Sequence, residues 1–296
     1  MIRFVAALVG TFVYKWAGAR AAGGESRLDA QGGSAMTAAE LSEEIERYVR
    51  PETFPLALRV MAEGEEVPER TRRPKADLGI QVSICQGVSM ARRYGWTIAM
   101  AGEDLSCPIA SVAFAFRRPP AFYAEGRLAE GMYAKDREGA LRTEASVPRA
   151  EVAGTVLVGP LRSARFEPEV VAVYGNSAQV MRMVAAALFE TGGSITSEFS
   201  ARADCAEIVN RTRQTGMPQV ILPCYGDRVF GQTQDHEMAF TLPWAASESF
   251  ARGLVGTHQG GVRYPIPHYL RYTADYPATY ETVKSIWREE DEDQGG

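Results

Sequence analysis

Four cysteines are the residues of this sequence best suited to metal or redox chemistry: Cys85, Cys107, Cys205 and Cys224. Each is expected at the edge of a helix or strand, and polar or turn-forming residues flank Cys107, Cys205 and Cys224. Cysteines that only fill a core usually lie among aliphatic residues, whereas functional groups collect at the ends of elements. Cys205 is expected in the first turn of a helix, where the positive end of the helix dipole would lower its pKa and favour the thiolate.

Four thiolates brought together from distant segments would suit an iron–sulfur cluster of the [4Fe–4S] type or, as the alternative, a tetrahedral zinc ion. Three thiolates with an open iron would suit a lyase or hydratase-like site. No two cysteines have Cys-x-x-Cys spacing, so the sequence indicates neither a zinc ribbon nor a thioredoxin-like motif. Independent reduced cysteines in the core and a redox disulfide therefore remain open as alternatives. If one site exists, the four sulfurs should lie within about 7 Å of one another.

The loop expected after Cys224 carries a second group of candidates, with Asp227, Arg228 and Glu237 as the expected catalytic residues. The Arg228 guanidinium could clamp a carboxylate or phosphate through two parallel hydrogen bonds, and Asp227 or Glu237 could orient that ligand or move protons. We expect Arg228 to face the same cavity as Cys224 and to pair with Asp227, Glu237 or another acid. The alternative is an ordinary polar hairpin, in which Asp227 and Arg228 form a surface pair of little energetic weight.

Composition narrows the class of protein. The chain has 296 residues, of which 46% are hydrophobic and 23% charged, and its net charge is −5; these values are typical of a soluble globular protein. No dense basic stripe is present, so nucleic acid is not an expected partner, whereas a small anionic ligand and a homo-oligomer are compatible with the composition. The apolar run from Phe4 to Val13 is far shorter than the roughly 20 residues of a membrane span. A domain of this size needs no disulfide staples, which favours reduced thiols in the cytoplasm over a secreted or periplasmic protein.

Hydrophobic periodicity predicts helices alternating with strands after Met36. Helices are expected over 37–50, 81–94, 176–190, 204–214 and 247–254, and strands over 54–61, 96–101, 153–161, 170–174, 195–200, 219–223 and 237–243. This alternation predicts a single α/β or α+β domain over 36–284, with a mixed β-sheet flanked by helices. Residues 1–35 are expected to be a poorly ordered leader or the product of a mis-called start, because Met36 directly precedes a helix start. Residues 285–296 are expected to form an acidic, disordered tail.

Several segments carry a family resemblance: Ser-Ile-Cys-Gln, Glu-Asp-Leu-Ser-Cys-Pro, Tyr-Gly-Asn-Ser-Ala-Gln, Asp-Cys-Ala-Glu, Leu-Pro-Cys-Tyr-Gly-Asp-Arg-Val-Phe-Gly and Gly-Val-Arg-Tyr-Pro-Ile-Pro. Through them the chain resembles domain-of-unknown-function family 169, a family of bacterial and archaeal proteins, over about Thr37 to Tyr280. The resemblance implies no established activity, so it groups the chain without supplying a mechanism. Because the cysteine-bearing segments are among those that match, it strengthens the interpretation of the cysteines as a metal or cluster site.

These observations together favour a cytoplasmic protein with an iron–sulfur or metal site on the four cysteines. It would be a redox or lyase-type enzyme that acts on a small anionic molecule. The alternative is a non-catalytic protein that binds a small ligand or a partner and whose cysteines are structural.

Overall fold

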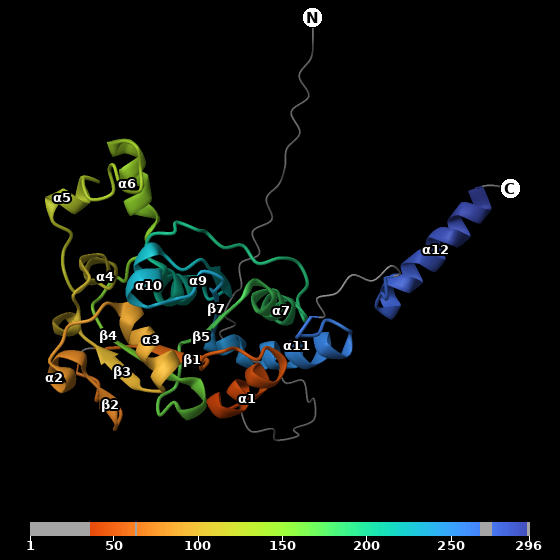
Figure 1. Ribbon diagram of the computed structural model, residues 1–296, viewed down its shortest axis with the longest axis horizontal. Coiled ribbons are helices and arrows are strands. Elements are labelled where there is room, and N and C mark those ends of the chain that lie inside the picture. Colours follow the sequence, from red (N-terminus) through yellow and green to blue (C-terminus); the bar gives the residue numbers. More distant parts are fainter. Residues whose placement is uncertain (1–35, 63, 267–273, 295–296) are drawn as a thin grey trace, which may run out of the picture. The chain divides into compact units, whose positions relative to one another are not determined.

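The computed structural model describes residues 36–62, 64–266 and 274–294 (Figure 1). The predictions made for residues 1–35 lie outside this range. The described residues belong to one compact unit. None of the helices in the described part of the chain is long and apolar enough to cross a lipid bilayer.

A seven-stranded mixed sheet forms the centre of the unit, in the order β2-β3-β4-β1-β5-β7-β6. The strands are β1 (Leu56–Met61), β2 (Thr71–Arg72), β3 (Thr97–Met100), β4 (Thr155–Pro160), β5 (Val170–Gly175), β6 (Gln219–Ile221) and β7 (Met238–Pro243). β2 and β3 pair in parallel, and the other described neighbours pair antiparallel. Every residue of β5 is buried, as expected for a central strand that is covered on both faces. The predicted α/β arrangement with a mixed sheet is therefore confirmed.

Helices cover both faces of the sheet (Figure 1). They are α1 (Ala38–Tyr48), α2 (Pro74–Leu78), α3 (Ile84–Tyr94), α4 (Pro108–Ala113), α5 (Ala121–Ala124), α6 (Arg137–Ser146), α7 (Ser177–Ala187), α8 (Asp204–Ala206), α9 (Thr212–Thr215), α10 (Tyr225–Phe230), α11 (Ser247–Gln259) and α12 (Ala278–Gln294). A π-helical stretch, Glu207–Arg211, joins α8 to α9. We call the continuous segment from Asp204 to Thr215 the site helix.

Each face of the sheet has its own core. Side chains of α3, α4 and the site helix pack with Ala172 and Tyr174 of β5 in the first core. Side chains of α1, α7 and α11 pack with Val171 and Val173 of the same strand in the second. Because side chains alternate along a strand, Tyr174 lies on the first face, where cysteine side chains also pack.

Local capping signals account for three of the helix starts. Thr37, Ser83 and Asn176 each accept a hydrogen bond from the backbone N–H three residues later, and the side chain at that later position bonds back to the cap. Such capping boxes satisfy donors that a helix start would leave unpaired. α3 then ends at Gly95, whose φ is 73°, a conformation that glycine adopts at little cost. The helices expected to begin at 37 and 176 thus start at the N-caps Thr37 and Asn176.

Three segments differ from the prediction. Residues 195–200 form no strand; their Ser197 hydroxyl accepts a 2.9 Å hydrogen bond from the backbone N–H of Val220 in β6, so a side chain meets the sheet edge there. The chain after Cys224 forms the helix α10 in place of a hairpin loop. The predicted disordered tail overlaps α12, where Lys284 and Glu281 lie 2.8 Å apart at the i,i+3 spacing that supports a helix.

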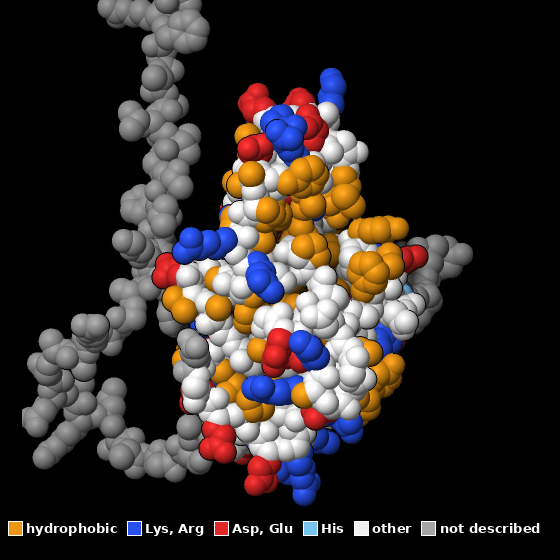
Figure 2. Space-filling view, turned by 90° about the vertical axis from the view of Figure 1, so that its left-hand side faces the viewer, with side chains coloured by type: hydrophobic (Ala, Val, Ile, Leu, Met, Phe, Trp, Pro, Cys, Tyr) orange, Lys and Arg blue, Asp and Glu red, His pale blue; other side chains and the backbone are white. Residues whose placement is uncertain are grey.

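The segment that carries α5 and α6 is tied to the site helix through a buried ion pair. Glu144 of α6 accepts a hydrogen bond from Arg202, and both side chains are almost fully buried. Figure 2 shows the face of the molecule on which this segment lies, with apolar side chains gathered below a charged tip. Because Arg202 precedes Asp204 by two residues, the ion pair fixes the approach of the chain to the site helix.

Candidate functional site

The four cysteines lie at element ends, as the sequence predicted. Cys85 is in the first turn of α3, Cys107 is the N-cap of α4, Cys205 is in α8 and Cys224 is the N-cap of α10. All four are free thiols; Cys85 and Cys224 are buried, and the other two are partly buried. No disulfide joins any two of them in the structure.

The cysteines come from distant parts of the chain into one region on the first face of the sheet. The Cys85 sulfur lies 3.9 Å from the carbonyl oxygen of Gly226, next to Cys224 in α10. Burial raises the pKa of Cys205 well above its usual value, and nearby charges on Asp204, Cys85, Cys224 and Cys107 raise it further. The other three thiols therefore lie close enough to Cys205 for their charges to raise its pKa. No group of three or more His, Cys, Asp or Glu in the described part of the chain has the arrangement of a ready metal site.

The thiolate predicted at Cys205 is wrong, because burial outweighs the helix dipole. Burial also raises the pKa of Cys85 to about 12 and that of Cys224 still further, with negative charges on Asp227 and Asp204 adding to the effect. Thiols in such surroundings keep their protons at neutral pH. A bound cation would reverse this balance, because a metal ion deprotonates the thiols that coordinate it.

Two buried aspartates, Asp204 and Asp227, face the thiols. Asp204 is 1% exposed, and neither of its oxygens accepts a hydrogen bond from an N–H or hydroxyl group of the described residues. Asp227 accepts one from Thr233 Oγ1 at 2.9 Å and one from the Tyr174 hydroxyl at 3.4 Å. Burial and the neighbouring Asp227 carboxylate raise the pKa of Asp204 well above its usual value. Asp204 therefore keeps a proton and donates it to Asp227.

Glu237, a predicted site residue, forms a buried ion pair with Arg92. The two Arg92 terminal nitrogens lie 2.6 and 3.1 Å from the Glu237 oxygens, and Arg92 also donates to Thr233 Oγ1 at 3.0 Å. The guanidinium lies 4.1 Å from the centre of the Tyr174 ring, within cation–π distance. The Thr233 hydroxyl in turn donates a hydrogen bond to Asp227. A continuous set of hydrogen bonds therefore joins this ion pair to the aspartates.

Arg228 makes different contacts from those predicted. Its guanidinium donates to the backbone carbonyl oxygens of Gln234 at 2.6 Å and Glu237 at 3.5 Å. The expected ion pair with Asp227 or Glu237 is thus replaced by bonds that hold the chain between α10 and β7. Position 231 in the same stretch requires glycine for a steric reason, because a Cβ atom there would lie 2.0 Å from Asp227 Oδ1.

Three members of the site were not expected from the sequence: Tyr174, Asp204 and Arg92. Asp204 precedes Cys205 and was expected only as the first residue of a helix, whose N-cap in the structure is Ala203. Tyr174 lies near the end of a buried strand, and Arg92 lies on the inward face of a helix with Cys85 and Val88. A charged residue on an apolar helix face is the signal that could have identified Arg92.

Comparison with known sequences places the chain in a family. The profile of domain-of-unknown-function family 169, described as "Uncharacterised ArCR", matches residues 44–253. The chain belongs to this family. One relative is the uncharacterised protein MJ0308 of Methanocaldococcus jannaschii, which is 26% identical over 193 residues, covering 64% of this chain and 81% of the relative. No solved structure matches the chain.

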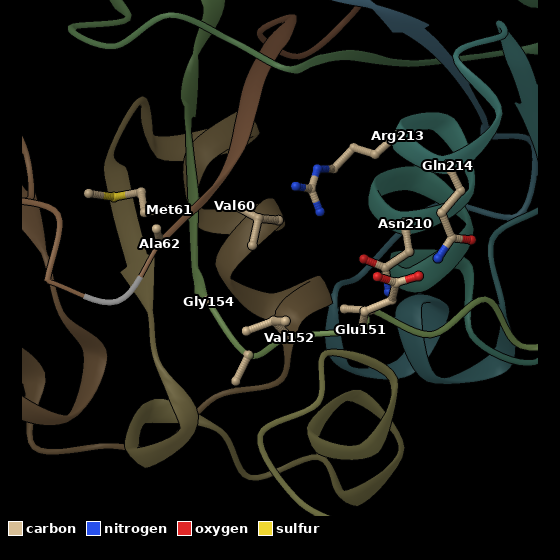
Figure 3. A pocket seen from close by; sticks show the side chains of 11 residues that line it. Val60, Met61, Ala62, Glu151, Val152, Gly154, Asn210, Arg213 and Gln214 are labelled. Carbon is tan, nitrogen blue, oxygen red and sulfur yellow. The ribbon is translucent and has the colours of Figure 1, made fainter.

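The range matched by family 169 contains all four cysteines and both aspartates of the site. It also includes residues of two pockets, neither of which is lined by a cysteine. The first has a volume of about 440 Å³ and lies between the end of β1, the start of β4 and the site helix (Figure 3). The second has a volume of about 640 Å³ and is lined by the arginines Arg50, Arg92, Arg93 and Arg162 together with two glutamates. Arg92 thus borders both the second pocket and the buried site.

In this member of family 169, Asp204→Asn should stabilise the metal-free chain at alkaline pH. The folded chain keeps the Asp204 proton that the unfolded chain loses above about pH 4, so the free energy of unfolding falls as pH rises above that value. The amide of Asn can still donate to Asp227 and has no charge to lose. We expect the melting temperature at pH 8 to rise by about 2–4 °C, as for a gain of about 1 kcal/mol.

The control is Asp235→Asn, which changes an exposed carboxylate and should leave the melting temperature at pH 8 unchanged. Thermal unfolding followed by circular dichroism at pH 5 and pH 8 measures both variants. Equal melting temperatures for Asp204→Asn and the parent chain at pH 8 would contradict the proton assigned to Asp204.

Proposed function

We propose that Cys85, Cys107, Cys205 and Cys224 hold an iron–sulfur cluster or a zinc ion, with iron–sulfur as the leading assignment. The observation that carries the proposal is the gathering of thiols and carboxyl groups in one buried region. The charge of Asp204 acts on Cys85, Cys205 and Cys224. Neither Asp204 oxygen accepts an N–H or hydroxyl hydrogen bond from the described residues. Sulfur ligands select zinc and iron–sulfur clusters over magnesium or calcium.

A bound cation would stabilise the ionised thiols and the ionised Asp204 carboxyl, which burial disfavours. Burial and mutual repulsion raise the pKa of Cys85, Cys205 and Asp204, and both effects oppose negative charge. A metal centre supplies the positive charge that stabilises thiolates, so binding releases protons and tightens as pH rises. The sulfurs would then close around the metal, since the described residues present no ready metal site.

The finer proposal is a redox or lyase-type enzyme that acts on a small anionic molecule. The arginine-lined pocket supports the anion: four arginines and two glutamates line it, an excess of two positive charges. Glu237 behind Arg92 offsets one of these charges, and Glu43 beside Arg162 offsets the other. Arg50, which has no ion pair among the described residues, is the guanidinium left for an anion. In this proposal Asp227 and Glu237 set the charge and proton supply of the site, while Arg228 positions the chain that carries Glu237.

Anaerobic purification followed by metal and sulfide analysis tests the metal proposal. For an iron–sulfur cluster we expect about four irons and four sulfides per chain, with an absorbance shoulder at about 400 nm. For zinc we expect about one ion per chain without sulfide. The full chain should be used, because the four cysteines span most of the described domain.

A chain that carries neither iron nor zinc after anaerobic purification would contradict the proposal. The raised thiol pKa values favour the second candidate in that case: a non-catalytic protein that binds a small ligand or a partner, with structural cysteines. Cys85 and Cys224 should then react with a thiol reagent only after unfolding, because both are buried.

A further inference from the structure

The pocket of about 440 Å³ in Figure 3 lies apart from the cysteines and has its own set of polar groups. Apolar walls come from Val60 and Met61 at the end of β1 and from Val152 before β4. Polar groups come from Glu151 and from three residues of the site helix, of which Asn210 and Arg213 project toward the space that Figure 3 shows. Such a mixture of apolar walls and a few convergent polar groups is typical of small-molecule sites.

Asn210 contributes an acceptor that the protein leaves without a donor. Its amide nitrogen donates to the carbonyl oxygens of Ala113 at 3.0 Å and Pro148 at 3.2 Å. These two bonds fix the orientation of the side chain, since an amide oxygen could not face two carbonyl groups. The amide oxygen is then buried and accepts no hydrogen bond from the described residues, and Asn210 is itself 1% exposed. Asn210 also lies in the π-helical stretch, and π-bulges are frequent at functional sites.

The positive charge that Arg213 brings to the pocket is already balanced by a neighbouring carboxylate. Arg213 makes two contacts with Glu169, at 3.0 Å from Nε and 3.2 Å from Nη2. The amide nitrogen of Gln214 donates to the carbonyl oxygen of Arg149 at 2.7 Å. Glu151, by contrast, has no ion pair among the described residues. The charge left without an ion pair at the pocket is therefore the exposed Glu151 carboxylate. The buried atom left without a donor is the Asn210 amide oxygen, and both groups are acceptors.

We propose that this pocket binds a small aliphatic amine. A protonated amine has the donors and the positive charge that Glu151 and the Asn210 amide oxygen lack, and a short alkyl chain matches Val60 and Met61. An anion would meet the uncompensated Glu151 carboxylate and is disfavoured. The site is independent of the metal proposal, because no cysteine lines it.

Calorimetric titration of the full chain with n-butylammonium tests the proposal, with n-butanol and butyrate as probes of matched size. We expect saturable binding of n-butylammonium alone. Glu151→Gln should weaken it at least about tenfold, which corresponds to about 1.4 kcal/mol. The matched control is Glu138→Gln, an exposed glutamate of α6 outside the pocket, which should leave the affinity unchanged.

Three results would overturn the proposal. One is the absence of saturable binding by n-butylammonium, and another is equal affinity for n-butylammonium in Glu151→Gln and the parent chain. The third is much tighter binding of N-acetyl-lysine amide than of n-butylammonium, which would assign the pocket to a lysine side chain of a protein partner. Cys205→Ser should not change amine binding, so failure of the metal proposal and failure of this one are distinguishable.

Discussion

Cys205→Ser is expected to lower the metal content of the anaerobically purified chain at least about tenfold, the scale on which changes at a metal site act. Cys205 is the thiol on which Cys85, Cys107 and Cys224 all act, so its sulfur is central to the proposed set of ligands. A serine hydroxyl is a poor substitute, because it stays protonated where a thiol loses its proton to the metal. Elemental analysis for iron and zinc, with sulfide analysis beside it, measures the loss.

A second substitution separates loss of a ligand from loss of the fold. Cys107 is the N-cap of α4, where its side chain makes no capping hydrogen bond, and serine is a preferred N-cap residue. Cys107→Ser should therefore fold at least as well as the parent chain and still lose metal. The matched control, Ala251→Ser, places a hydroxyl at a buried position of α11 in the second core and should retain metal. Parent-like metal content in both cysteine variants would contradict the metal site.

The features that the sequence predicted correctly depend on interactions between residues close together along the chain. The N-caps at Thr37 and Asn176 depend on residues three positions away, and the buried strand over 170–174 depends on its own run of apolar residues. The cysteines were placed at element ends for the same reason. Local pattern therefore predicted the α/β class and much of the element order.

The parts that were missed depend on contacts between distant segments. Arg92 and Glu237 are 145 residues apart in the sequence, and nothing near Glu237 indicates an arginine on α3 as its partner. The predicted strand over 195–200 has suitable apolar residues, but β6 bonds the Ser197 side chain there instead of a strand backbone. Arg228 was expected to pair with a carboxylate, whereas the carbonyl oxygens of its own chain lie nearer. Distance along the chain thus set the limit of the sequence analysis.

Arg92→Met is expected to cost about 3–5 kcal/mol of the free energy of unfolding at pH 7, the range for breaking a buried ion pair from one side. The side chains of Arg92 and Glu237 are 1% and 5% exposed. Methionine fills similar volume but leaves Glu237, among the described residues, with the 3.5 Å contact to Arg93 as its one ion pair. It also removes the donor to Thr233 and the cation above the Tyr174 ring. Chemical denaturation at pH 7 measures the loss.

The pH dependence of this loss identifies its cause. Burial alone would raise the pKa of Glu237, but hydrogen bonds from Arg92 and Gln234 lower it below the usual value. A carboxylate with a lowered folded pKa contributes stability above its unfolded pKa, about 4.3, and loses it as pH falls through the folded pKa. The difference between Arg92→Met and the parent chain should therefore be largest near neutral pH and shrink at acid pH, as Glu237 becomes protonated in both chains.

Arg142→Met is the matched control, because it breaks the exposed pair of Arg142 and Glu138 at i,i+4 spacing in α6. Such a pair contributes about 0.3–0.5 kcal/mol, so this variant should unfold within about 1 kcal/mol of the parent chain at every pH. If Arg92→Met also stayed within that margin, the Arg92–Glu237 pair would have no structural role. Packing of the surrounding core would then be enough to hold Thr233 and Asp227 in place without the hydrogen bond from Arg92.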